Sequence, residues 1–334
     1  MWVGLLLVLF AALLQGTFLM PLALTRKWAW EHGWAAFSLF AMIVLNWAIA
    51  SVVLPNPIAI YALVPWRDLF ALAAFGAGWG VGAVLFGLGM DKLGLTLGYP
   101  LIMGLNAAVG ALVPLFWLRQ ADPFSTRTLI LAGGIALAIA GIIVCSIAGA
   151  YRNPAPNSQT APPSAFRTGL LIAVVAGCLS ALPNVGMAWG ASVIEKARLM
   201  GATATLAGNA VWAIFFTVGG LVNLAYCGWL MVHRSSLAAL AGPESPRNLG
   251  LSSVSSLMWI GSLYLYGSGA ARMGQWGAPI GWPVMTATSI GVGISWGLLK
   301  GDWRGAPRAA NRLLVGGLLL IVAAVAWLGF ANRV

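Results

Sequence analysis

Charged residues are absent from ten long stretches of the chain. No Asp, Glu, Lys or Arg occurs in residues 2–25, 33–66, 69–90, 93–118, 128–151, 168–194, 199–233, 248–271, 273–299 or 313–332. Each stretch has at least 20 residues, which is the length that an α-helix needs to cross the hydrocarbon core of a bilayer. The sequence therefore predicts an all-α membrane protein with ten transmembrane helices.

The overall composition excludes several other classes of protein. Of the 334 residues, 60% are hydrophobic and only 7% are charged, whereas a soluble domain carries about 25% charged residues. This excludes a soluble enzyme, a disordered chain and a nucleic-acid binder. A membrane β-barrel would show short segments that alternate apolar and polar residues. This chain does not show them, so a β-barrel is not predicted. The three cysteines lie inside apolar stretches without a metal-binding spacing, so no metal site or disulfide framework is predicted.

The basic residues predict how the chain is oriented. The loops after the first, third, fifth, seventh and ninth stretches hold eleven of the eighteen Lys and Arg residues, and the remaining loops and the C-terminal tail hold seven. Cytoplasmic loops of membrane proteins carry an excess of Lys and Arg. The loops with these eleven Lys and Arg residues are therefore expected in the cytoplasm. Because the first of them follows the first stretch and the number of stretches is even, both termini are expected outside.

The longest loop divides the chain into two halves with five stretches each. Residues 152–167 are rich in Pro, Ser and Asn, a composition typical of a flexible linker. We expect one five-helix unit in residues 1–151 and a second in residues 168–334. The sequence Gly-Leu-Leu opens both units, at Gly4 and at Gly169.

A longer match between the halves indicates an internal repeat. Trp79 is followed seven residues later by FGLGMDKLG, and Trp259 is followed seven residues later by YGSGAARMG, at a constant offset of 180 residues. Because five helices are an odd number, the second copy would enter the membrane from the opposite face. Inverted repeats of this kind are common in secondary transporters, whose substrate site lies near the midplane where the halves meet.

Short motifs along nearly the whole chain give a more specific resemblance. They are Arg26-Lys27-Trp28-Ala29-Trp30-Glu31, Leu54-Pro55-Asn56, Phe75-Gly76, Trp79-Gly80, Leu257-Met258-Trp259 and Leu299-Lys300 with Trp303. In order and spacing this set resembles the L-rhamnose–proton symporter family of the drug/metabolite transporter superfamily. The resemblance implies a ten-helix importer of the bacterial inner membrane that couples a 6-deoxy sugar to proton entry. It implies no cofactor beyond the proton gradient.

Aromatic and amide side chains inside the stretches are the candidates for binding a sugar. Such a ligand needs hydrogen-bonding groups and an apolar or aromatic surface. Trp79 and Trp259 occupy equivalent repeat positions, so we expect a site between them; the alternative is that each fills the core. Asn184 follows Pro183, which can break its helix, and Gln15 is its approximate partner in the first half. The other candidates are Tyr266, Trp282, Asn106 and Asn209.

A proton carrier is harder to identify. Intramembrane carboxylates are the usual carriers, but all seven acidic residues lie in or beside the predicted loops. Glu31 is the best candidate because it ends the Trp-Ala-Trp-Glu motif and leads into the second stretch. Burial in a crevice would favour its protonated form. The alternative is an interfacial ion pair between Glu31 and Lys27.

Together these features predict a secondary transporter that works by alternating access. The sequence contains no GxxxxGK[ST] motif, so direct use of ATP is not expected. It also lacks the nucleophile, metal-binding or paired-acid constellations of an intramembrane enzyme, and no catalytic residue is predicted. The expected partners are a small sugar, protons and the lipid bilayer. A proton-independent facilitator or an exporter of another small metabolite remains the alternative.

Overall fold

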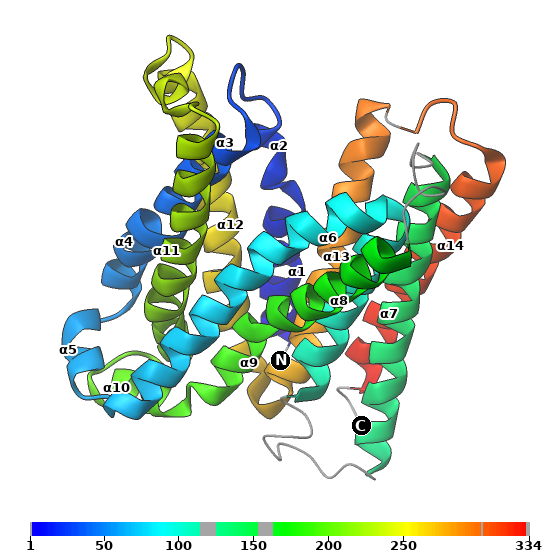
Figure 1. Cartoon of the computed structure of the whole chain (residues 1–334). Coiled ribbons are helices and arrows are strands. Elements are labelled where there is room, and N and C mark those ends of the chain that lie inside the picture. The colour runs from blue at the N-terminus through cyan, green and yellow to red at the C-terminus, as the bar shows by residue number, and fades with distance from the viewer. Residues whose placement is uncertain (1, 114–124, 153–162, 302, 332–334) are drawn as a thin grey trace.

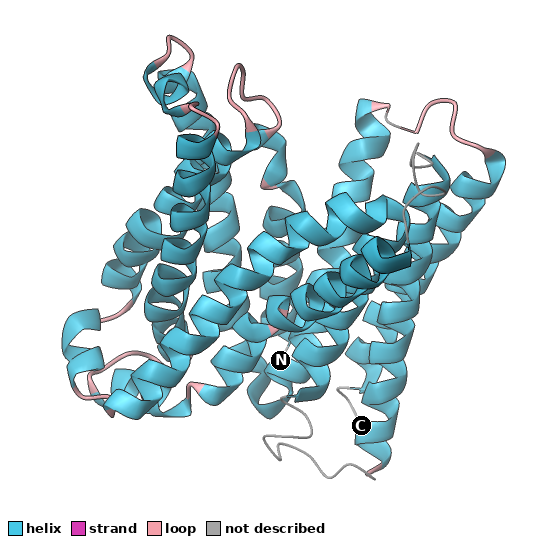
Figure 2. Ribbon diagram, in the orientation of Figure 1, coloured by secondary structure: helices cyan, strands magenta, loops and turns pink. Residues whose placement is uncertain are grey.

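The protein is helical throughout the part of the chain that the structure describes. The computed structural model describes residues 2–113, 125–152, 163–301 and 303–331, and no strand occurs in these ranges (Figure 2). The helices are α1 (Trp2–Thr17), α2 (Leu19–Leu22), α3 (Trp30–Ser38), α4 (Leu45–Val53), α5 (Pro57–Ala62), α6 (Trp66–Leu112), α7 (Thr126–Arg152), α8 (Pro163–Ser180), α9 (Leu182–Trp189), α10 (Ala191–Leu199), α11 (Ala210–His233), α12 (Ser245–Met273), α13 (Gly277–Lys300) and α14 (Arg308–Ala331). A π-helical turn, η1 (Leu39–Val44), joins α3 to α4. The prediction of an all-α protein is confirmed for these residues.

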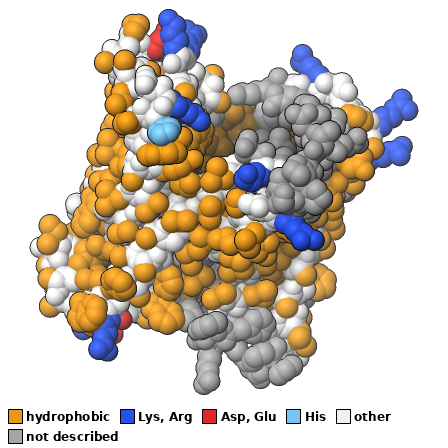
Figure 3. All heavy atoms as spheres, viewed as in Figure 1, with side chains coloured by type: hydrophobic (Ala, Val, Ile, Leu, Met, Phe, Trp, Pro, Cys, Tyr) orange, Lys and Arg blue, Asp and Glu red, His pale blue; other side chains and the backbone are white. Residues whose placement is uncertain are grey.

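Within the described residues, six helical segments are long and apolar enough to cross a bilayer. They are Trp2–Leu22, Trp30–Val53, Trp66–Gly89, Thr128–Gly149, Arg167–Trp189 and Ala207–His233. Hydrophobic side chains cover most of the molecular face seen in Figure 3, and the Lys and Arg side chains on this face are few. An apolar surface of this extent needs an apolar surrounding, which is consistent with a membrane protein.

The helix α6 contains the two stretches that the sequence separates at Asp91 and Lys92. A straight helix would place Gly89 and Ile102 about 20 Å apart, at 1.5 Å per residue. Instead, a Cβ atom built on Gly89 would lie 3.3 Å from Cδ1 of Ile102, and Phe86 packs in the same apolar cluster as Ile102. The chain therefore folds back within α6 and presents two arms. The side chain of Asp91 lies outside the described residues.

Helices from the two predicted halves pack against each other. α1 contacts α12 and α13, while α8 contacts α6, and α7 lies beside α14 at one edge of the molecule (Figure 1). The predicted linker of residues 152–167 lies mostly outside the described residues, and α8 begins within it at Pro163. Because the helices of the two halves interleave, side chains from both reach the centre of the bundle.

Glycine allows α6 and α11 to approach closely. A Cβ atom on Gly76 would lie 2.1 Å from the carbonyl oxygen of Phe215, and one on Gly219 would lie 2.8 Å from Cε3 of Trp79. Small residues at helix contacts permit tight packing in lipid, where no hydrophobic effect drives helices together. This contact fixes the position of Trp79 beside α11.

We expect Gly76→Ala to destabilise the protein by about 1–3 kcal/mol, the usual effect of overpacking a close contact. Gly87→Ala on the same helix is the matched control, because a Cβ atom there meets no described atom within 4 Å. Thermal unfolding of the purified protein in detergent should give a lower melting temperature for Gly76→Ala and an unchanged or higher one for Gly87→Ala. Equal melting temperatures for the two variants would contradict the close contact between α6 and α11.

Candidate functional site

A cavity of about 230 Å³ lies at the centre of the bundle. Its walls come from α1, α3, both arms of α6, α8, α9, α11, α12 and α13, and so from both predicted halves. The lining residues are Gln15, Trp34, Trp79, Ala83, Phe86, Met103, Asn106, Ser180, Pro183, Phe216, Trp259, Leu263, Trp282, Met285, Thr286 and Ser289. Pockets for drug-sized ligands usually measure about 300–1,000 Å³, so this cavity suits a smaller solute.

The two repeat-related tryptophans form one aromatic wall of this cavity. The rings of Trp79 and Trp259 are stacked, with centroids 5.6 Å apart and an interplanar angle of 28°. Phe216 contacts both rings edge-on, at 5.3 Å from Trp79 and 5.0 Å from Trp259. In this conformation the stacked rings leave no room for a sugar between them, and the site between the two tryptophans stays a prediction. A ligand can contact only their cavity side.

Three of the predicted polar residues line the cavity. Gln15 accepts a hydrogen bond from the Ser262 hydroxyl at 2.7 Å. Asn106 is 8% exposed, and its Oδ1 has no partner among the described residues. The indole nitrogen of Trp282 is likewise buried and has no partner there. Both atoms are therefore buried groups of residues that line the cavity, and the indole nitrogen of Trp282 lies against Gly110 of α6.

Two other predicted residues, Asn184 and Tyr266, do not line the cavity but pair with each other beside it. The Asn184 amide donates to the carbonyl oxygens of Gly110 and Ala278, and its Oδ1 accepts from the Tyr266 hydroxyl. The ring of Tyr266 packs edge-on against Trp282 at 5.5 Å. This network joins α6, α9, α12 and α13, and holds Trp282 in place.

The chain is interrupted where the proline of this region predicts a break. α8 ends at Ser180 and α9 begins at Leu182, and the N–H of Asn184 donates to the carbonyl of Ala181. Pro183 lines the cavity beside Ser180. The break therefore brings Ser180 to the cavity and turns Asn184 toward the neighbouring helices.

Asn209, the remaining predicted amide, lies where α11 meets α12. It donates to the Ser268 hydroxyl at 2.9 Å and accepts from the indole N–H of Trp212 at 3.2 Å. Only 1% of it is exposed, and it does not line the cavity. In this conformation its contacts are with other side chains of the bundle.

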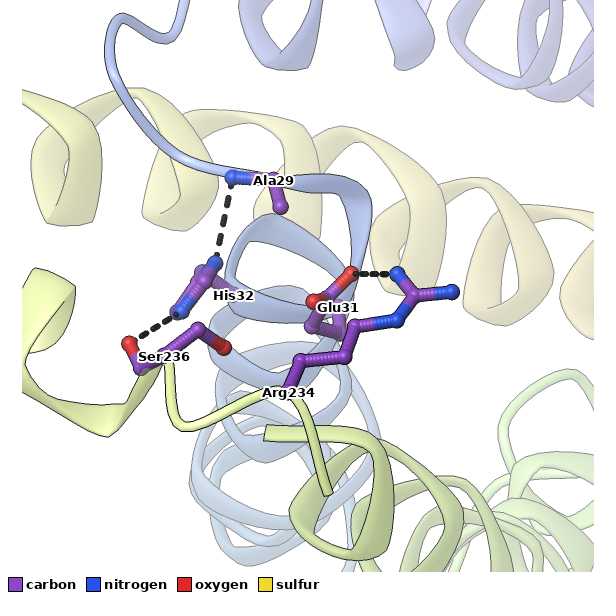
Figure 4. A network of polar contacts seen from close by, with 5 residues as sticks. All are labelled: Ala29, Glu31, His32, Arg234 and Ser236. Atoms are coloured by element: carbon purple, nitrogen blue, oxygen red, sulfur yellow. Dashed lines mark hydrogen bonds and ion pairs between the residues drawn. The ribbon is translucent and has the colours of Figure 1, made fainter. Parts of the chain in front are cut away.

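Glu31 is buried at the start of α3 and pairs with a residue that the sequence did not suggest. Its Oε2 lies 3.0 Å from Nη1 of Arg234, just after α11 (Figure 4). The only ion pair found for Glu31 in the described residues is this one, so the expected pair with Lys27 is not observed. Its second oxygen, Oε1, is buried and has no partner among the described residues.

The neighbouring His32 ties the same two segments together. Its Nδ1 accepts from the backbone N–H of Ala29 at 3.1 Å, and its Nε2 lies 2.8 Å from the carbonyl oxygen of Ser236 (Figure 4). Because Nδ1 accepts and a carbonyl can only accept, the hydrogen of the neutral ring is on Nε2. The start of α3 is thus joined to the loop after α11 by both an ion pair and a histidine.

Sequence reasoning missed two polar cavity residues, Ser180 and Thr286, that the repeat offsets would have found. The offset of 180 residues pairs Asn106 with Thr286, and the offset of 165 between Gly4 and Gly169 pairs Gln15 with Ser180. All four of these polar residues line the cavity. Trp34 and Phe216 have no comparable signal in the sequence. No group of three or more His, Cys, Asp or Glu side chains gathers in the described part of the chain.

Comparison with known proteins identifies the family. The model of the L-rhamnose-proton symport protein family matches residues 1–332. The chain belongs to this family. Relatives named L-rhamnose-proton symporter include those of Mannheimia succiniciproducens, 27% identical, and Escherichia coli strain 55989, 28% identical, each aligned over 94% of both chains. That of Yersinia pestis strain Pestoides F is 26% identical over 92% of this chain and 91% of its own.

Membership in this family confirms two features predicted from the sequence. Members of a symport family are transport proteins rather than enzymes. Together with the six apolar helical segments, this makes the chain a multi-pass membrane protein. The cavity at the centre of the bundle is therefore the candidate transport site.

We expect Asn184→Ala to destabilise the protein, because it leaves the Tyr266 hydroxyl and two backbone carbonyls without their partner. Each buried group left unpaired costs about 1–3 kcal/mol. Asn106→Ala is the matched control, since its Oδ1 has no partner to lose among the described residues. Melting temperatures in detergent should fall further for Asn184→Ala than for Asn106→Ala. The reverse order would show that the Asn184 network does not hold the bundle together.

Proposed function

We propose that this protein is a secondary transporter that imports L-rhamnose, or a related 6-deoxy sugar, together with protons by alternating access. The observation that carries the proposal is the central cavity, lined from both halves of a chain that belongs to the L-rhamnose-proton symport protein family. The proton gradient is its energy source, with no further cofactor. Its partners are the sugar, protons and the lipid bilayer, and it binds no nucleic acid.

The proposed architecture is ten transmembrane helices in a 5+5 inverted repeat, with halves 1–151 and 168–334 joined by the loop 152–167. Equivalent contacts support it. A Cβ on Gly89 would lie 3.4 Å from Cα of Ala173, and a Cβ on Gly269 would lie 3.0 Å from Cγ2 of Val8. The repeat offsets relate Gly89 to Gly269 and Val8 to Ala173. We further propose that this arrangement is the fold of the drug/metabolite transporter superfamily and that the chain belongs to that superfamily.

The proposed orientation places both termini outside the inner membrane of a bacterial cell. The backbone N–H of Arg26 donates to the side chain of Asn248, and the indole of Trp28 donates to the carbonyl of Ala239. The loops after the first and seventh predicted spans therefore meet on one face, as alternation of the spans requires. These loops carry part of the larger set of Lys and Arg residues, which favours the cytoplasmic side.

In the proposed site the apolar face of the sugar ring stacks on the cavity side of the Trp79–Trp259 wall. Asn106, Trp282 and Gln15 are the polar lining residues that we propose bind its hydroxyls. Aliphatic lining such as Leu263 offers a surface to the methyl group of a 6-deoxy sugar. Asn184, Tyr266 and Asn209 act in this proposal by positioning the helices that carry the site. Glu31 is the proposed proton carrier.

The first test is uptake of labelled L-rhamnose into liposomes that contain the purified protein. We expect accumulation above the external concentration when an inward proton gradient is imposed, and collapse of the accumulation when a protonophore is added. Protein-free liposomes are the control. Equilibration without any effect of the gradient would make the protein a facilitator, and the absence of rhamnose uptake by folded protein would contradict the proposed substrate.

Trp79→Ala and Trp259→Ala should each weaken rhamnose binding roughly tenfold, which corresponds to about 1.4 kcal/mol. The physical reason is loss of the aromatic surface that the sugar ring contacts. Trp229→Ala is the matched control because Trp229 is exposed and stacks on His233 outside the cavity. Binding measured by calorimetry on folded protein checks this. Unchanged affinity in both cavity variants would remove the tryptophan wall from the site.

A further inference from the structure

We propose that Arg234 replaces the proton on Glu31 during the return of the empty transporter, so that the charge of Glu31 is always neutralised. This inference rests on the proposed function, in which Glu31 carries the proton. It assigns a role to Arg234, which lies 203 residues away from Glu31 in the sequence. Proton binding and the ion pair would then be mutually exclusive states of one carboxylate.

The two partners differ greatly in their access to solvent. The Glu31 side chain is 1% exposed and that of Arg234 is 59% exposed. A buried carboxylate needs a compensating charge or a proton, because an unpaired buried charge is strongly unfavourable. An exposed guanidinium, by contrast, can leave the pair and be solvated. Glu31 is therefore the fixed partner and Arg234 the one that can be released.

Glu31 also has one carboxylate oxygen that no described residue pairs with and that could bind a proton. Arg234 contacts Oε2, whereas the buried Oε1 has no partner among the described residues. A proton taken up from solution would bond to Oε1 and make the carboxyl group neutral. The attraction for the guanidinium would then be lost, and Arg234 would turn to solvent. When the proton leaves to the opposite solution, the carboxylate is negative again and Arg234 pairs with it.

The other ionisable groups near Glu31 in the described structure have different partners. His32 is hydrogen-bonded to the backbone of Ala29 and Ser236. On α11, His233 stacks on Trp229, while Cys227 is a buried thiol. On α12, Arg247 donates to the carbonyl of Leu24. Lys27 forms no ion pair with Glu31 among the described residues, and Glu244 is an acid that cannot compensate a negative charge. Arg234 is thus the group placed to compensate its charge.

The ion pair is linked to the cavity through α3 and α11. Trp34 lies three residues after Glu31, on the same side of the helix, and it lines the cavity. Its indole N–H donates to Asn223 of α11 at 2.9 Å. Separation of α3 from α11 would therefore change the cavity and break the ion pair together. Neutralising Glu31 with a proton removes one of the contacts that hold these helices.

Arg234→Gln tests the inference because it separates two kinds of transport. Exchange of labelled for unlabelled rhamnose uses only the loaded, protonated form, so it should continue at a rate near that of the unaltered protein. Net uptake also requires return of the empty form, in which Glu31 would now be negative and unpaired. We expect net uptake to fall at least tenfold. Arg234→Lys should keep most of it, and Arg247→Gln, which removes a positive charge nearby, should be unaffected.

A double variant gives the sharper result. In Glu31→Gln the residue is neutral in every state, so rhamnose should run down its own gradient without being accumulated by a proton gradient. Adding Glu31→Gln to Arg234→Gln should therefore restore downhill net uptake. The continuing exchange in Arg234→Gln serves as the evidence that this variant is folded.

Two outcomes would overturn the inference alone: gradient-driven accumulation in Arg234→Gln equal to that of the unaltered protein, or a folded double variant as inactive in net uptake as Arg234→Gln. If the unaltered protein itself shows no gradient-driven rhamnose uptake, the proposed function fails first and the inference with it. If Glu31→Gln still accumulates rhamnose with the gradient, Glu31 is not the carrier and Arg234 has no proton to replace.

Discussion

Hydrocarbon offers no hydrogen bonds, so every polar group inside the bundle depends on a partner from the protein. The buried asparagines follow this constraint. Asn46 donates to the backbone carbonyls of Met42 and Trp212 and accepts from Tyr264, and Asn184 binds groups from three other helices. These side chains join helices of both halves. The bundle is therefore held by a few amides at helix crossings as well as by close packing.

Among the described residues, three of the six buried side-chain atoms without a partner belong to residues of the proposed transport machinery. They are Oδ1 of Asn106 and Nε1 of Trp282, two residues that line the cavity, and Oε1 of Glu31, whose other oxygen pairs with Arg234. Unsatisfied buried groups destabilise a fold, and a ligand that supplies the missing partner stabilises the state that binds it. A sugar hydroxyl and a proton are ligands of this kind.

The sequence allowed the helical class and part of the site to be predicted, because both follow from local patterns. Trp79, Trp259, Gln15 and Asn106 were found from their repeat positions or from polarity within apolar stretches. The placement of Asn184 could not be predicted, because the break after Ser180 rotates its side chain away from the cavity. The partner of Glu31 was also missed. Lys27 is near in sequence, whereas Arg234 comes close only when α3 packs against α11.

The polar lining has a consequence for how a chiral ring is held. The sequence offsets between the halves pair Gln15 with Ser180 and Asn106 with Thr286, and all four residues line the cavity. The first half thus contributes long amides, and the second half contributes short hydroxyls at the equivalent points. A site built from two related halves would otherwise accept a sugar in two orientations related by the pseudo-twofold axis. In the proposed 5+5 repeat, the difference between amides and hydroxyls would remove that degeneracy and distinguish the two ends of the sugar.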